Sequence, residues 1–351
     1  MGVRFAFTNR CVAMDGTLEP PAAGSTGAGA PALPPAPASG PGPQHAGDGG
    51  SSQRAGSHGQ AMGPPPVPPV RGPRRARPLR GIAALVGLLL MVLALDVVLG
   101  GASPTVRAGQ AAWVARVAGA RAAAQLPRPG WERLDAGAVQ VVYPAGHRQG
   151  AVWVRDYALE SLPRVARVTG LPVPVQPAVF IVHASPADLA RTFGWDPQDP
   201  PLGFYAAGVI HVADPMTWAG DRETFARLGP VPHELAHWLL DRAALGNYPA
   251  WFTEGLAQAV DRAVTGFTFG WAESCPPVAW EDLNGAFASL PTDEAYGAAL
   301  CVYDRLVARS GPGALARLAS TLAAGRPFAA AVRQVYGVEP ARLVSGAPAA
   351  D

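Results

Sequence analysis

The chain has 351 residues, a formal net charge of +2, 41 glycines and 38 prolines. A net charge this close to zero argues against a nucleic-acid-binding protein, and all 28 basic residues are arginines. Two domains would fit this length, but glycine and proline are concentrated in the first 80 residues. We therefore expect one folded domain in the remainder of the chain.

Residues 1–80 are predicted to form a disordered cytoplasmic tail. Between 15 and 70 the segment is rich in Pro, Gly, Ala and Ser and has few apolar side chains, so it cannot bury enough surface to offset its ordering entropy. The proline run at 64–69 favours an extended polyproline conformation. In an alternative interpretation, this segment is an upstream extension of a protein that starts at Met62.

An apolar run over 82–98 follows a cluster of arginines and contains one charge, Asp96. The arginines are Arg71, Arg74, Arg75, Arg77 and Arg80. The span 81–101 is long enough to cross a hydrocarbon core of roughly 30 Å, and its positive flank keeps the amino end in the cytoplasm. We therefore expect a single-pass protein of the cell membrane with an extracytoplasmic domain. The alternative is a signal peptide cleaved near 100–103, which would make the domain secreted.

After the apolar span, residues 102–133 are predicted to form a juxtamembrane linker or helix, and the folded domain is predicted to occupy 134–345. The first half of this domain alternates short apolar runs with helical patterns. Strands are predicted at 139–143, 177–183 and 208–214, and helices at 151–169 and 186–193.

A helix predicted at 231–245 carries His233 and His237. Pro232 is tolerated only in a first turn, so the histidines lie near the helix start. Residues four apart differ by about 40° around the helix axis and lie one turn apart on the same face. The two imidazoles can therefore bind one zinc ion, and Glu234 lies where its carboxylate can accept a proton from water.

A second helix is predicted at 250–264, directly after Pro249. It carries Glu254, 16 residues beyond His237, as the third zinc ligand. Three protein ligands leave the fourth position of a tetrahedral zinc ion open for water and substrate, as catalysis requires.

The rest of the chain is predicted to be mostly helical, with helices at 293–308, 312–324 and 327–335. Cys275 and Cys301 both lie in the part predicted to be exported, where an oxidising environment permits a disulfide that closes a loop of 26 residues. Two buried free thiols are the alternative.

These motifs resemble the gluzincins of the peptidase MA superfamily, whose signature is an H-E-x-x-H helix followed by a glutamate ligand on the next helix. The resemblance is closer to small bacterial peptidase-MA-like domains, in which the second helix reads proline, tryptophan, an apolar residue, any residue, then E-G-x-A. The matching residues are Pro249, Trp251, Phe252, Glu254, Gly255 and Ala257.

The resemblance covers about 134–343 and implies an α+β fold with a small mixed sheet lobe, the two metal helices and a helical C-terminal lobe. It implies that His233, His237 and Glu254 are zinc ligands and that Glu234 is the general base. In gluzincins a sheet edge pairs with the extended substrate, and we expect the strand at 209–213 to do so here.

The chain departs from the family pattern at Gln258, four residues after Glu254, where many gluzincins have a carboxylate that orients a ligand histidine. The Gln258 amide oxygen can accept the histidine N–H, and Asp261 is the alternative partner. For the oxyanion donor, Tyr296 is the first candidate, followed by His211 and Tyr248.

The expected function is that of a membrane-anchored zinc metallopeptidase acting on a peptide or protein substrate. One alternative is a zinc-binding but non-hydrolytic domain that serves in envelope assembly or partner binding, which Gln258 and the uncertain oxyanion donor would favour. Another is a membrane-anchored binding module without a metal.

Overall fold

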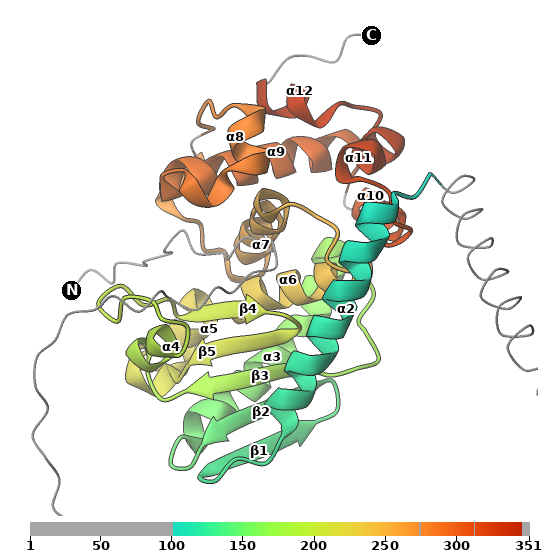
Figure 1. Ribbon diagram of the computed structural model, residues 1–351. Coiled ribbons are helices and arrows are strands. Elements are labelled where there is room, and N and C mark those ends of the chain that lie inside the picture. Colours follow the sequence, from blue (N-terminus) through green and yellow to red (C-terminus); the bar gives the residue numbers. More distant parts are fainter. Residues whose placement is uncertain (1–100, 274, 312, 346–351) are drawn as a thin grey trace, which may run out of the picture. The chain divides into compact units, whose positions relative to one another are not determined.

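Short runs rich in β-branched and aromatic residues form a mixed sheet in the computed structural model, which describes residues 101–273, 275–311 and 313–345 (Figure 1). The strands are β1 (Trp131–Ala136), β2 (Val139–Pro144), β3 (Ala178–His183), β4 (Gly203–Ala206) and β5 (Val209–Ala213). Their order is β1-β2-β3-β5-β4. The inner pairs β2–β3 and β3–β5 are parallel, and the outer pairs β1–β2 and β4–β5 are antiparallel.

The three predicted strands are confirmed as β2, β3 and β5, whereas β1 and β4 were not predicted. Within the described part of the chain, strand β1 pairs on one side only and is largely exposed, so it tolerates charged residues that hide a strand pattern. Strand β4 has only four residues and turns directly into β5. Ala207 and Gly208 form that turn with φ of 45° and 83°, the positive values that a two-residue type I′ hairpin turn requires.

Helices cover both faces of the sheet (Figure 1). They include α2 (Pro104–Gln125), α3 (Arg148–Thr169), α4 (Pro186–Thr192) and α6 (Val231–Ala244). Phe180 and Ile210 belong to the core shared with α3 and α6, whereas their neighbours Ile181 and Val209 pack with Ala124 of α2. Successive strand side chains point to opposite faces, so the sheet separates an α6 face from an α2 face.

Helix α2 lies in the segment predicted as a juxtamembrane linker or helix, and it is joined to the domain at both ends. Arg121 donates hydrogen bonds to the carbonyls of Gly208 and Pro177, at 3.1 and 2.7 Å. Nearer the start of the helix, Gln110 donates to the carbonyl of Leu322 at 2.8 Å. The helix thus links the sheet to the C-terminal helices.

The second half of the domain is helical, as predicted. Its elements are α5 (Arg222–Leu228), α7 (Ala250–Thr265), α8 (Trp280–Gly285), α9 (Thr292–Ser310), α10 (Gly313–Ala323), α11 (Phe328–Tyr336) and α12 (Pro340–Ser345), with 3-10 turns at Pro215–Thr217, Gly270–Glu273 and Phe287–Ser289. The predicted helices correspond to α3, α4, α6, α7, α9, α10 and α11, whereas α5, α8 and α12 were not predicted. Helix α7 packs against both α6 and α9, and a side chain at Gly255 would collide with the Ala299 carbonyl of α9.

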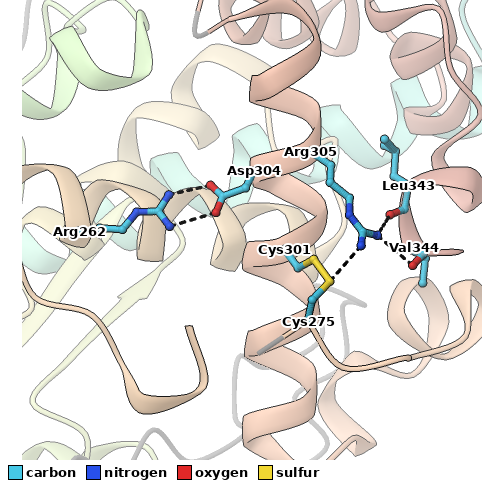
Figure 2. Close-up of a disulfide and its surroundings, with 7 residues drawn as sticks. All are labelled: Arg262, Cys275, Cys301, Asp304, Arg305, Leu343 and Val344. Atoms are coloured by element: carbon cyan, nitrogen blue, oxygen red, sulfur yellow. Dashed lines mark hydrogen bonds and ion pairs between the residues drawn. A yellow bond between two sulfur atoms is a disulfide. The ribbon is translucent and has the colours of Figure 1, made fainter. Parts of the chain in front are cut away.

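Cys275 and Cys301 form a disulfide, with their Cα atoms 5.5 Å apart, rather than two free thiols (Figure 2). It joins the segment after α7 to α9. Arg305 lies beside it and donates to Cys275 Sγ and to the carbonyls of Leu343 and Val344, which connects α9 to α12.

The predicted disordered tail and, apart from Gly101, the predicted transmembrane span lie outside the described residues. Within the described residues, no helix combines the length and apolar character needed to cross a membrane.

Candidate metal centre

Helix α6 presents two histidines from its first turns. Pro232 occupies the first turn, and the amide of Glu234 donates to the Pro230 carbonyl at 2.9 Å. His233 and His237 are both buried, and their ring centroids are 4.8 Å apart with the rings near perpendicular. The i, i+4 spacing therefore places both imidazoles on the same face, as predicted.

Helix α7 brings the third predicted ligand to the same point. The Glu254 carboxylate is 1% exposed, and its oxygens lie 3.4 Å from His233 Nε2 and 3.6 Å from His237 Nε2. Donor atoms about 2.1 Å from one tetrahedral zinc ion lie roughly 3.4 Å from one another, so this spacing fits a shared ion. His233, His237 and Glu254 thus form a group that can hold a metal ion.

Hydrogen bonds hold each imidazole in the orientation that a ligand needs. His233 Nδ1 lies 2.8 Å from Asp261 Oδ2, and His237 Nδ1 lies 2.6 Å from Thr253 Oγ1. When Nδ1 carries the proton and donates it to these oxygens, the Nε2 lone pair is directed at the ion. Thr253 was not predicted, although it directly precedes Glu254 in the motif.

The two histidines differ electrostatically because their partners differ. Burial disfavours the charged form of His233, but Asp261, Glu254 and Glu234 together outweigh it and raise the pKa of His233 well above its ordinary value. Burial lowers the pKa of His237 to about 4, with Glu254 opposing this shift and His233 adding to it, and its hydrogen-bond partner Thr253 carries no charge. His233 is therefore the more basic of the two ligands.

Gln258 does not orient a histidine, so the expectation for that residue is corrected. Its Nε2 donates to the carbonyls of Glu254 and Tyr296, at 3.3 and 3.0 Å, and its Oε1 accepts from Trp271 Nε1 at 2.9 Å. Gln258 thus connects α7 to α9 and to the segment after α7. The alternative partner, Asp261, is the carboxylate that contacts His233.

Glu234 lies between α6 and strand β4. It is 3% exposed, and a Cβ atom added to Gly203 would be 3.2 Å from its Oε1. Burial raises the pKa of Glu234 to about 8, and the nearby charge of Glu254 adds to this rise. His233 and a hydrogen bond from the main chain of Tyr205 act in the opposite direction. A buried carboxyl with a pKa in this range can exchange a proton near neutral pH.

The three candidate oxyanion donors occupy different places. Tyr296 is buried in α9, with its ring centroid 6.1 Å from Trp271 and 5.5 Å from Phe287, and its role stays a prediction. The Tyr248 hydroxyl donates to Asp241 at 3.2 Å. His211 alternates with strand residues that face α6, and its Nδ1 lies 3.0 Å from His183 Nε2 on the α2 face.

The sheet edge next to the metal helix is β4, which corrects the expectation for residues 209–213. Strand β5 pairs with β3 on one side and with β4 on the other, so its main-chain groups are used within the sheet. Among the residues that the structure describes, β4 pairs only with β5, and it contacts α6. The short strand that sequence patterns missed therefore borders the site.

Comparison of the chain with protein-family models, with curated proteins and with solved structures finds no match in any of the three. The metal-binding assignment depends on the geometry of α6 and α7.

Proposed function

We propose that the protein is a zinc metallopeptidase that hydrolyses peptide bonds. One observation carries this proposal: two imidazole nitrogens and a carboxylate converge at distances that suit one ion, and the buried carboxyl of Glu234 lies on the neighbouring residue of α6. A metal site with a purely structural role has no use for a general base at that position.

Zinc is the metal that this donor set favours. Two histidines and one glutamate are a donor set of catalytic zinc sites, which leave the fourth position of a tetrahedron for water or substrate. When bound, zinc supplies Lewis-acid polarisation of a peptide carbonyl and a lowered pKa for water. His233, His237 and Glu254 would hold it, with Asp261 and Thr253 keeping the imidazoles in position.

Glu234 would carry the proton during hydrolysis. As general base it takes a proton from the attacking water, and as general acid it delivers that proton to the amine of the departing peptide fragment. Its burial and its position between α6 and β4 keep bulk water away from the carboxyl group. These features support acid–base work rather than a surface role.

Strand β4 supports a peptide or protein as the substrate. An edge strand presents main-chain groups that can pair with an extended chain. One outward group of this edge, on the main chain of Tyr205, already meets the Glu234 carboxylate, so a peptide would pair with the remaining outward groups. An extended peptide beside β4 would therefore lie near the proposed base.

Two further observations bear on the alternatives. A non-hydrolytic zinc-binding domain was favoured by Gln258 and by the uncertain oxyanion donor, and Asp261 answers the first of these because it provides the carboxylate that Gln258 lacks. The Cys275–Cys301 disulfide supports a domain that works outside the cytoplasm, since disulfides persist in oxidising compartments.

Glu234→Gln in the full-length chain tests the proposal. The variant should retain one zinc per chain, measured by elemental analysis, while peptide cleavage falls by about 10²–10⁴-fold because the base is removed. Glu223→Gln, at an exposed glutamate of α5, is the matched control and should cleave as the parent does. Undiminished cleavage by Glu234→Gln would refute the mechanism, and a zinc-loaded parent that cleaves no member of a broad peptide library would refute the peptidase assignment.

A further inference from the structure

Tyr205, in the middle of strand β4, contacts the candidate metal centre through three different groups. Its hydroxyl donates to Asp241 Oδ2 at 2.6 Å. Its ring stacks against the ring of His237, with centroids 6.3 Å apart and planes 26° apart. Its main chain forms a hydrogen bond with the Glu234 carboxylate. One residue of the edge strand thus contacts a metal ligand, the proposed base and a buried acid of the same helix.

The hydrogen-bond register of β4 explains how its main chain reaches Glu234. The amide of Ala213 donates to the carbonyl of Leu202 at 2.9 Å, which makes these opposite residues a hydrogen-bonded pair. In an antiparallel ladder such pairs alternate, so Phe204 bonds to β5 and Tyr205 turns its N–H away from the sheet. That outward N–H is the group available to Glu234.

Asp241 provides a fixed anchor for the Tyr205 hydroxyl. It lies one turn beyond His237 on α6 and is 1% exposed. The hydroxyl of Tyr248, from the connection between α6 and α7, also donates to it at 3.2 Å. A buried carboxylate that accepts two phenol hydrogen bonds joins β4, α6 and that connection in one arrangement.

Two residues of β4, Gly203 and Tyr205, are held against α6 in different ways. At Gly203 the strand lies so close to the start of α6 that an added Cβ would be 2.5 Å from the Pro230 ring. That contact is steric, so it does not fix how the strand is rotated relative to the helix. The bond between Tyr205 and Asp241 is directional, so it sets how the strand is rotated relative to the helix.

We propose that Tyr205 is a positioning residue of the metal centre: its bond to Asp241 holds β4 against α6, so that its ring orients His237 and its N–H orients Glu234. The role in hydrolysis rests on the proposed function. The role in orienting His237 concerns metal binding and does not need peptidase activity.

Tyr205→Phe in the full-length chain removes the hydroxyl and keeps the ring. Loss of an outer partner of a metal site typically costs about 10–100-fold, so we expect kcat for peptide cleavage to fall by about that factor with KM changed less than threefold. Tyr143→Phe is the matched control, because its buried hydroxyl donates to Glu132 at 2.7 Å away from the site. Equal kcat values in the two variants would overturn the proposal.

The zinc dissociation constant separates this proposal from the proposed function. Measured by competition with a chromophoric chelator, it should rise about tenfold in Tyr205→Phe and stay unchanged in Tyr143→Phe, whether or not the parent cleaves peptides. An unchanged constant in Tyr205→Phe would overturn the role in orienting His237.

Asp241→Leu acts on the same link from the other side, because it removes both carboxylate oxygens that accept from the two phenol hydroxyls. If Tyr205 and Asp241 work as a unit, the double variant loses no more than the more severe single variant. Additive losses would contradict the link. Circular dichroism and the thermal midpoint of each variant show whether it is folded.

Discussion

Replacing Asp261 by asparagine removes the negative charge behind His233 and keeps the size of the side chain. Both groups are buried, and the Nδ1–Oδ2 distance is 2.8 Å, so solvent does not screen the interaction. Outer partners of this kind are worth about 10–100-fold in metal affinity, which corresponds to about 1.4–2.8 kcal/mol. The asparagine oxygen can still accept from Nδ1, so we expect a loss of zinc affinity near tenfold, and a larger loss for Asp261→Ala.

The assay is zinc competition with a chromophoric chelator at constant pH, on the full-length chain. Asp304→Asn is the control, since Asp304 forms an exposed ion pair with Arg262 on the neighbouring helix (Figure 2). Exposed pairs contribute about 0–1 kcal/mol to stability, and this one has no contact with the ligands. An affinity of Asp261→Asn within twofold of the parent would refute the reasoning that the negative charge of Asp261 strengthens zinc binding by His233.

Two further predictions concern the fold. Replacing Cys275 and Cys301 by serine should lower the free energy of unfolding by about 3–4 kcal/mol, because the disulfide closes a loop of 26 residues. Chemical denaturation of the oxidised parent and of the variant measures this difference, and equal stabilities would contradict the prediction. Burial lowers the pKa of His183 to about 4 and that of His211 to about 3, so the unfolded chain binds more protons below about pH 6.5. The free energy of unfolding should therefore fall by about 2 kcal/mol for each of these two histidines between pH 7 and pH 5. Denaturation of His211→Phe over that range should show a shallower slope than the parent.

The metal ligands were predictable because their pattern is local. His233 and His237 lie four residues apart on one helix, so helical geometry alone places them on one face. Pro249 marks the start of the next helix, which put Glu254 in its first turns. The strands β2, β3 and β5 were equally readable, since strands buried on both faces appear as continuous apolar runs.

The neighbours of the ligands were decided by tertiary structure. Gln258 and Asp261 follow Glu254 by four and seven residues, and both spacings return to the same face of a helix. The crossing of α7 over α6 determined that Asp261 meets His233, while Gln258 turned toward α9. The helical period does not distinguish between these outcomes. Which of the two side chains meets His233 depends on the angle between α6 and α7.

The sequence by itself determined which residues can bind the metal and which apolar runs become the inner strands. Tertiary structure decided that β4 is the sheet edge, that His211 meets His183 and Phe193 on the face away from α6, and that Tyr205 and Asp241 meet 36 residues apart. A strand of four residues carries too few positions to show an alternating pattern, and its place at the edge follows only from its pairing with β5. Contacts within one helical turn are encoded locally, whereas contacts between a strand and a helix exist only after the chain has folded.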